Sequence, residues 1–525
     1  NHIKLPGSAN TNGKTEPYPV SKIREALPQF FAVGAKNLLL LTFGTTLGFS
    51  TILIPALSTN PSYTVEEISW IGSINLFMVP LGGFVSGPVS QRLGRRLTMM
   101  LTTIPFVFAW LMFYNASSIN MLFLAMGVTG FTGGLLEAPV LTYVAEVTQP
   151  HLRGLLSATS TMAVICGTFS QVLARRFVEW RTVALINIVY PLICFTALYM
   201  VPESPTWLAG KGRLSDAEKA LCWLRGWVTP DHVKGEFRGL CESIQRPINV
   251  MTINSIILES PVTTKPEQQP TKKTWHMYLQ RTFYLPFILV TLVFFINAFG
   301  GIMVLQIYAV LILEKLNTPI DKYTATAVMG ISQVLGTIIC VCIIHFTGKR
   351  KLSFFSVFPT GVCLLMISIF GHLVEQGKID GVAYSWFPTT LLVGAAFFSH
   401  ICLKTLPWIL AGEVFPAEVR SVATGSAGSI GYIFSSIASY LFPHMNASVG
   451  LPATLLIYAL VNIGGVICLY FMLPETEGRT LKEIEEHYAG INRLEDRPSK
   501  DKVAGKEIWA ISNPQPVKDD IESRL

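Results

Sequence analysis

Charged residues are scarce in this sequence. Only 14% of its 525 residues are charged, half are hydrophobic, and the mean hydropathy is +0.47. A soluble protein would carry about 25% charged residues. Long apolar runs recur between residues 33 and 473, each near the roughly 20 residues that a helix needs to cross a bilayer. Because the alternating short segments of a membrane barrel are missing, we predict a multi-pass helical membrane protein.

Patterns that carry enzyme chemistry are also missing. The nine cysteines have no disulfide or zinc spacing, and we interpret them as free packing thiols. Without a nucleophile–base constellation, a phosphate loop or a metal spacing, we expect neither an enzyme nor a cofactor. Residues 1–32 are polar and have no cleavable signal sequence, which indicates a disordered tail.

Twelve apolar segments are interpreted as membrane spans in an all-α fold of two pseudo-symmetric six-helix bundles, with the bilayer as a partner. The spans are 33–57, 68–90, 97–115, 120–145, 155–174, 182–201, 284–313, 323–346, 352–373, 383–412, 420–444 and 451–473. The predicted parts are an N-terminal tail (1–32), a first bundle (33–201), a helical segment with linker (202–282), a second bundle (283–473) and a C-terminal tail (474–525).

The distribution of Lys and Arg predicts which side each loop faces. If both termini and the segment 202–282 are cytoplasmic, that side holds 33 of the 40 Lys and Arg residues, counting Lys36 at the rim. This bias follows the positive-inside rule. It explains the net charge of +7 without a nucleic-acid partner, and no obligate protein partner is evident. Both N-x-S sequons, at Asn115 and Asn446, then fall outside as weak glycosylation candidates.

Short charged motifs repeat in the two halves. RLGRR follows span two and FTGKRK follows span eight, while PESPTWL follows span six and PETEGRTL follows span twelve. Charge-assisted pairs between these helix ends would form a cytoplasmic latch that holds the bundles shut on one face; the alternative is that they are ordinary interfacial charges. The predicted latch residues are Arg92, Arg95, Arg96, Glu146, Arg153, Glu203, Lys349, Arg350, Glu413, Arg420 and Glu475.

This motif set resembles the sugar porter family of the major facilitator superfamily, over about residues 33–490. EEISWIGS and PETEGRTLKEIE are similar to its insect facilitated trehalose transporter-like members. The resemblance implies two six-helix bundles, alternating access, a carbohydrate substrate and, by default, the plasma membrane.

The resemblance also implies a sugar site, which this sequence keeps only in part. Asn297, Gln333, Trp408, Tyr432 and Thr161 match or replace family positions that line the site, and they supply amides and aromatic faces for a sugar. The matching positions for three further amides are Ala298, Met303 and Gly431. A site built for hydroxyls loses affinity when amides are lost, so ordinary glucose transport is doubtful. The alternative is that the retained residues only pack or bridge helices.

The family's proton-coupling pair is absent from the matching positions. Proton-linked members have an acid in span one and an arginine in span four, where this chain has Ser50 and Met126. Neither side chain titrates near neutral pH, which favours a facilitative uniporter.

Two opposite charges lie deep in equivalent spans. Lys404 lies nine residues before Glu413, and Glu137 lies nine residues before the equivalent Glu146. Because unpaired charges at mid-bilayer cost roughly 2.5–3.5 kcal/mol, we expect Glu137 and Lys404 to pair across a central cavity or to bind a charged substrate, with His400 beside Lys404. The alternative is that each faces water separately.

Three functions remain open. The leading one is alternating-access transport of a sugar or sugar-like solute. The others are transport of a charged small solute, such as a sugar acid, by Lys404 and Glu137, and a non-transporting sugar sensor.

Overall fold

The computed structural model describes residues 21–241, 280–415, 419–477, 479, 481–491 and 494. Within these residues every regular element is a helix. The chain divides into two compact units: Asn1–Phe49 with Phe77–Gln268, and Ser50–Leu76 with Gln269–Leu525.

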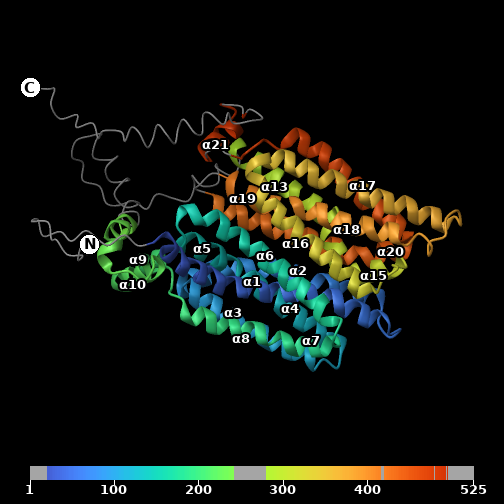
Figure 1. The fold of residues 1–525 in the computed structure, drawn as a ribbon, viewed down its shortest axis with the longest axis horizontal. Helices are drawn as coiled ribbons and strands as arrows, with labels where there is room; N and C mark the ends of the chain where they lie inside the picture. Colours follow the sequence, from blue (N-terminus) through green and yellow to red (C-terminus); the bar gives the residue numbers. More distant parts are fainter. Residues whose placement is uncertain are drawn as a thin grey trace, which may run out of the picture. The chain divides into compact units, whose positions relative to one another are not determined.

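The first unit packs its helices side by side. Figure 1 shows α3 lying along α4, α7 and α8, which it contacts. The short helices α9 and α10 pack on each other through a small apolar cluster that includes Leu208 and Ala217. The helices of this unit are α1 (Lys22–Ser58, as far as Phe49), α2 (Val65–Leu93, from Phe77), α3 (Arg95–Tyr114), α4 (Ile119–Leu135), α5 (Glu137–Val147), α6 (Pro150–Arg175), α7 (Trp180–Asn187), α8 (Val189–Met200), α9 (Pro205–Gly210) and α10 (Leu214–Leu224).

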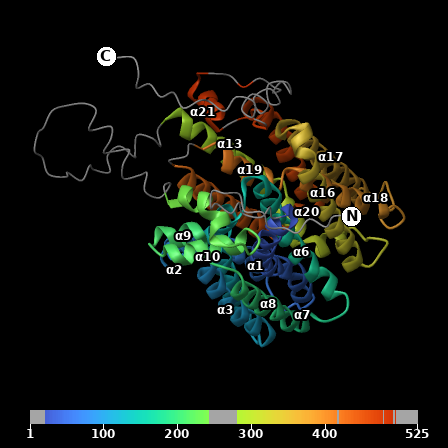
Figure 2. The ribbon, with the colours of Figure 1, turned by 60° about the vertical axis from the view of Figure 1, so that its left-hand side comes forward.

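The second unit has its own core. Its helix α17 packs against α18 and α20, and α16 packs against α18, as Figure 2 shows. Residues 50–76 belong to this unit, where Thr51 donates to the Gln306 carbonyl at 2.9 Å and Ser436 donates to the Ser73 carbonyl at 3.1 Å. Its other helices are α13 (Arg281–Phe299), α14 (Ile302–Ile307), α15 (Ala309–Lys315), α16 (Lys322–Thr347), α17 (Lys349–Glu375), α18 (Trp386–Ile401), α19 (Leu406–Glu413), α20 (Arg420–Met472) and α21 (Leu481–Ala489).

The all-helical prediction is confirmed. In the described part of the chain, ten helical segments are long and apolar enough to cross a membrane. The expected spans 420–444 and 451–473 run together as α20, with a non-helical residue, Gly450, between them. The expected span 155–174 forms α6, which is not among the ten.

Several predicted spans are interrupted. The span 120–145 divides into α4 and α5 at Leu136, and the span 383–412 divides into α18 and α19 across residues 402–405. The span 284–313 divides at Gly300–Gly301 and again at Tyr308. These breaks expose backbone groups inside apolar segments, and such groups need partners.

The predicted helices outside the spans are present. LSDAEKALCWLRG forms α10, and TLKEIEEHY contains α21. All nine cysteines are free thiols, as predicted. The linker SPVTTKPEQQPTKKTW and most of both tails lie outside the described residues.

Candidate functional site

A charge network lies where α2, α3 and α5 end or begin in the first unit. Arg95 makes a two-pronged ion pair with Glu146, with its Nη2 and Nε atoms 2.9 and 3.0 Å from the carboxylate oxygens. Glu203 accepts hydrogen bonds from the backbone N–H groups of Arg95 and Arg96, each at 3.0 Å. A carboxylate at a helix N-terminus is favoured because it meets unpaired N–H groups and the positive end of the helix dipole.

The second unit contains the same network, with lysine in place of arginine. Lys349 Nζ lies 2.6 and 2.8 Å from the two Glu413 oxygens and 2.8 Å from Glu477. Glu475 accepts from the backbone N–H groups of Lys349 and Arg350, each at 3.0 Å. The latch motifs therefore repeat in three dimensions as well as in sequence.

The ion pairs described above for this network each join residues of one unit. The role of the network as a latch between the bundles remains a prediction. The side chains of Arg153 and Arg420 lie outside the described residues, and Arg92 is exposed at the end of α2.

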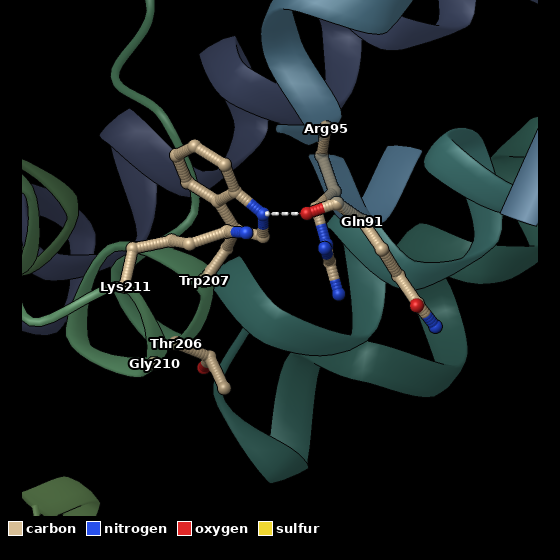
Figure 3. Close-up of a pocket in the computed structure, with 6 residues that line it drawn as sticks. All are labelled: Gln91, Arg95, Thr206, Trp207, Gly210 and Lys211. Atoms are coloured by element: carbon tan, nitrogen blue, oxygen red, sulfur yellow. Dashed lines mark hydrogen bonds between the residues drawn. The ribbon is translucent and has the colours of Figure 1, made fainter. Parts of the chain in front are cut away.

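A cavity of about 240 Å³ lies beside the first network (Figure 3). Trp207 lines it and donates from its indole nitrogen to the Gln91 carbonyl at 3.0 Å, and the Lys211 ammonium lies 5.7 Å from the Trp207 ring centre. None of the predicted substrate residues lines this cavity, and Arg95 is its only contribution from the predicted latch. The cavity therefore adjoins the charge network through Arg95.

Glu137 and Lys404 occupy equivalent helix breaks. Glu137 is the first residue of α5, directly after the break at Leu136, and Lys404 lies in the break between α18 and α19. Both side chains are partly exposed. Their equivalence was predicted from the repeat, but the breaks themselves were not. Pairing of Glu137 with Lys404 remains a hypothesis.

The side-chain contact of Lys404 within the described part of its own unit is with a thioether. Its ammonium contacts the Met303 sulfur at 3.3 Å. Asn297 donates to the carbonyls of Leu403 at 3.0 Å and Lys404 at 3.5 Å, so this predicted site residue holds the backbone of the break. His400 is fully buried, with Nδ1 2.9 Å from the Ala396 carbonyl and Nε2 without a hydrogen-bond partner within the described residues.

The other predicted sugar-site residues of the second unit are an amide, Gln333, and two aromatic residues, Trp408 and Tyr432. Gln333 is 4% exposed, and its side chain makes no hydrogen bond within the described part of the chain. Trp408 contacts Phe294 edge-on at 5.1 Å and Tyr432 at 5.9 Å between ring centres. A Cβ at Gly431 would overlap the Phe294 ring, so the missing amide there is replaced by aromatic surface.

The remaining candidate site residue, Thr161, lies in the first unit. It is partly exposed on α6.

Comparison with known proteins decides the family. The model of the family described as "Sugar (and other) transporter" matches residues 43–488. The chain belongs to this family. It is therefore a multi-pass membrane carrier rather than an enzyme, and the predicted family resemblance is confirmed.

Relatives in insects agree with this assignment. The facilitated trehalose transporter Tret1 of Bombyx mori is 26% identical over 455 residues, which cover 86% of this chain and 84% of the relative. The Apis mellifera ligustica Tret1 is 27% identical over 428 residues, covering 81% of this chain and 80% of the relative.

Solved structures agree on the fold. The proton:xylose symporter XylE, bound to 6-bromo-6-deoxy-D-glucose, has a TM-score of 0.67 at 18% identity, covering 88% of this chain and all of the symporter. The inward-open XylE from E. coli also gives 0.67 at 18% identity, covering 87% and 99% of the two chains. The predicted major facilitator fold is therefore confirmed.

Sequence analysis missed two buried polar groups. Lys36, counted at the rim, is fully buried and donates to the Ser160 hydroxyl at 2.6 Å, beside a bond from Asn37 to Thr159. Asn462, on α20, donates to the Gly300 carbonyl in the break between α13 and α14 at 2.9 Å. Polar residues inside apolar spans are the signal that could have marked both.

The two sequons differ in their surroundings. Asn115 is the exposed C-cap of α3, whereas Asn446 lies within α20 and accepts a hydrogen bond from Lys315 at 3.1 Å. Glycosylation at either one remains a prediction.

Proposed function

We propose that this protein carries a sugar or sugar-like solute across the membrane by alternating access, as a facilitative uniporter. The observation that carries the proposal is the charge network repeated in both units, Arg95 with Glu146 and Lys349 with Glu413. A pair of matched networks at helix ends suits a carrier whose two halves move relative to each other, because each network can stabilise one half as a rigid body. A static sensor does not need both.

We further propose that Gln333, Asn297, Trp408, Tyr432 and Thr161 contact the solute. The Gln333 amide, which has no hydrogen-bond partner among the described residues of its own unit, is suited to hydroxyls, and the 37% exposed Trp408 indole is suited to a ring face. The names of the insect relatives make trehalose the first solute to test. The plasma membrane, with both termini in the cytoplasm, is the proposed location.

Uptake in cells with low background transport tests the proposal. Labelled trehalose and glucose are given at two outside pH values, with surface protein quantified. We expect saturable uptake that does not depend on pH, since Ser50 and Met126 replace a titratable pair. Normal surface expression without uptake of any sugar or sugar acid would contradict the proposal and favour a sensor.

A further inference from the structure

Among the described residues, the ammonium of Lys404 has fewer partners than that of Lys349, a buried lysine of the same unit. Lys349 Nζ meets three carboxylate oxygens within 2.8 Å, two from Glu413 and one from Glu477. An ammonium has three donors to satisfy. The Lys349 ammonium is therefore saturated with anionic acceptors.

By contrast, the one hydrogen-bond acceptor of the Lys404 ammonium among the described residues of its unit is a weak one. Its ammonium contacts the Met303 thioether at 3.3 Å, and among the described residues of its own unit no carboxylate pairs with it. A thioether sulfur accepts hydrogen bonds poorly. A cation in a membrane span with such a partner has unfilled capacity for an anion.

The surrounding structure holds the backbone beside Lys404 in place. The helix is interrupted between α18 and α19, and there Asn297 donates to the Leu403 carbonyl at 3.0 Å. From α17, the Ser356 hydroxyl accepts from the Leu403 N–H at 3.0 Å and donates to the Phe398 carbonyl at 2.7 Å. Two side chains from other helices thus hold the break that presents Lys404.

Groups suited to hydroxyls occur on the helices packed against this break. Gln333 lies on α16, which packs against α18, and its amide makes no hydrogen bond within the described residues. Trp408 lies one turn after Lys404, with 37% of its surface exposed. A cation, an amide and an aromatic face together suit a solute with a carboxylate and several hydroxyls.

We infer that the substrate class of this carrier includes sugar acids, whose carboxylate binds the Lys404 ammonium. The inference rests on the proposed transport function and deepens it by naming the solute. Neutral sugars lack the anionic group, so they use only the amide and aromatic part of the site.

Uptake of two labelled probes, D-glucuronate and D-glucose, tests the inference in proteoliposomes with the membrane potential collapsed. The wild type is expected to prefer glucuronate. Lys404→Met removes the charge at similar length, and we expect it to lower glucuronate uptake about tenfold or more, the loss of a charge-assisted bond. We expect the loss of glucuronate uptake to exceed any loss of glucose uptake, and Lys404→Arg is expected to keep the preference for glucuronate.

Lys36→Met is the matched control. It removes a lysine from another apolar helix, one that is fully buried and whose partner is the Ser160 hydroxyl in the first unit. We expect it to leave the ratio of glucuronate to glucose uptake unchanged, even if it lowers the amount of folded protein.

Three outcomes would overturn the inference. One is wild-type uptake of glucose without glucuronate, which leaves the proposed function standing. Another is glucuronate uptake that Lys404→Met does not reduce. The third is a loss of both uptakes by the same factor in Lys404→Met, with both uptakes restored when Glu137→Gln is added. Lys404 would then act only by compensating the charge of Glu137. Uptake of neither probe nor of trehalose would instead contradict the proposed function itself.

Discussion

Gly94 and Gly348 hold the same unusual backbone conformation at equivalent places. Their φ and ψ angles are 101° and 164°, and 82° and 157°, a region that only glycine adopts readily. Each precedes a helix whose first N–H groups bind a carboxylate, Glu203 or Glu475, and a Cβ at either glycine would overlap that carboxylate. At each of these helix starts, the lack of a side chain on the glycine therefore makes room for the carboxylate.

Substitution of Gly348 by alanine is expected to destabilise the protein. The backbone strain alone is worth about 1–3 kcal/mol, and displacement of Glu475 leaves two N–H groups without their acceptor. The melting temperature of purified protein measures the loss. Gly464→Ala is the matched control, since a Cβ there meets open space. Equal melting temperatures for both variants would contradict this account.

Exchange of Lys349 tests the repeated network at the residue scale. Lys349→Met leaves Glu413 and Glu477 without their cation, and breaking a buried ion pair costs roughly 3–5 kcal/mol. We expect the lower end of this range because the Glu413 side chain is 29% exposed. Lys349→Arg is expected to lose less, because Arg95 performs this role in the first unit. Thermal unfolding of both variants is the measurement. Equal losses of stability would show that the repeat does not predict whether arginine can replace Lys349.

At the scale of elements, the helix breaks carry the residues of interest. Lys404 lies in one break, Glu137 follows another, and Met303 is the second residue of α14 after a third. Asn462 stabilises the third break, donating to the carbonyls of Gly300 at 2.9 Å and Tyr458 at 2.8 Å. A break within a span is stable only if its freed backbone groups find such partners.

Asn462→Ala is expected to loosen the start of α14. The loss of a buried neutral hydrogen bond costs about 0.5–1.5 kcal/mol, and because α14 carries Met303, the apparent affinity for the solute should also fall. Concentration-dependent uptake, normalised to surface protein, measures this apparent affinity.

Asn187→Ala provides the comparison for Asn462→Ala. It breaks a buried amide pair with Gln171, whose two hydrogen bonds measure 2.7 and 3.0 Å and bridge no predicted site residue. We expect it to lower stability without changing the affinity. An unchanged affinity in Asn462→Ala would count against a positioning role.

At the scale of the whole molecule, sequence predicted the helices and their repeat well. Hydropathy located the spans, and the equal spacing from Glu137 to Glu146 and from Lys404 to Glu413 predicted that the two charges occupy equivalent places. The motifs PESPTWL and PETEGRTL predicted the carboxylates that now cap α3 and α17. Such features follow from local sequence, since length, charge and spacing determine them.

The breaks and their partners were not predictable in the same way. The run that contains Gly300 and Gly301 is mostly apolar, so hydrophobic periodicity alone does not show where it divides. Asn462 contacts that break from 162 residues away, and Lys36 reaches its partner over 124 residues. These contacts depend on tertiary packing, which a single sequence does not display.

The absence of a proton-coupling pair gives a prediction for the whole carrier. In proteoliposomes, an imposed inward proton gradient is expected to cause no transient accumulation of trehalose above the outside concentration, because neither Ser50 nor Met126 binds a proton near neutral pH. The time course of labelled trehalose measures this. Accumulation that a protonophore abolishes would refute uniport and favour symport.

Counterflow is the most direct test of the central claim that this protein is a carrier with alternating access. Proteoliposomes are loaded with unlabelled trehalose and diluted into a trace of labelled trehalose, and the label inside is followed over time. The account predicts faster and larger entry of label into loaded vesicles than into empty ones, since a loaded carrier returns with solute. Equal entry into both, at the rate of protein-free vesicles, would contradict it.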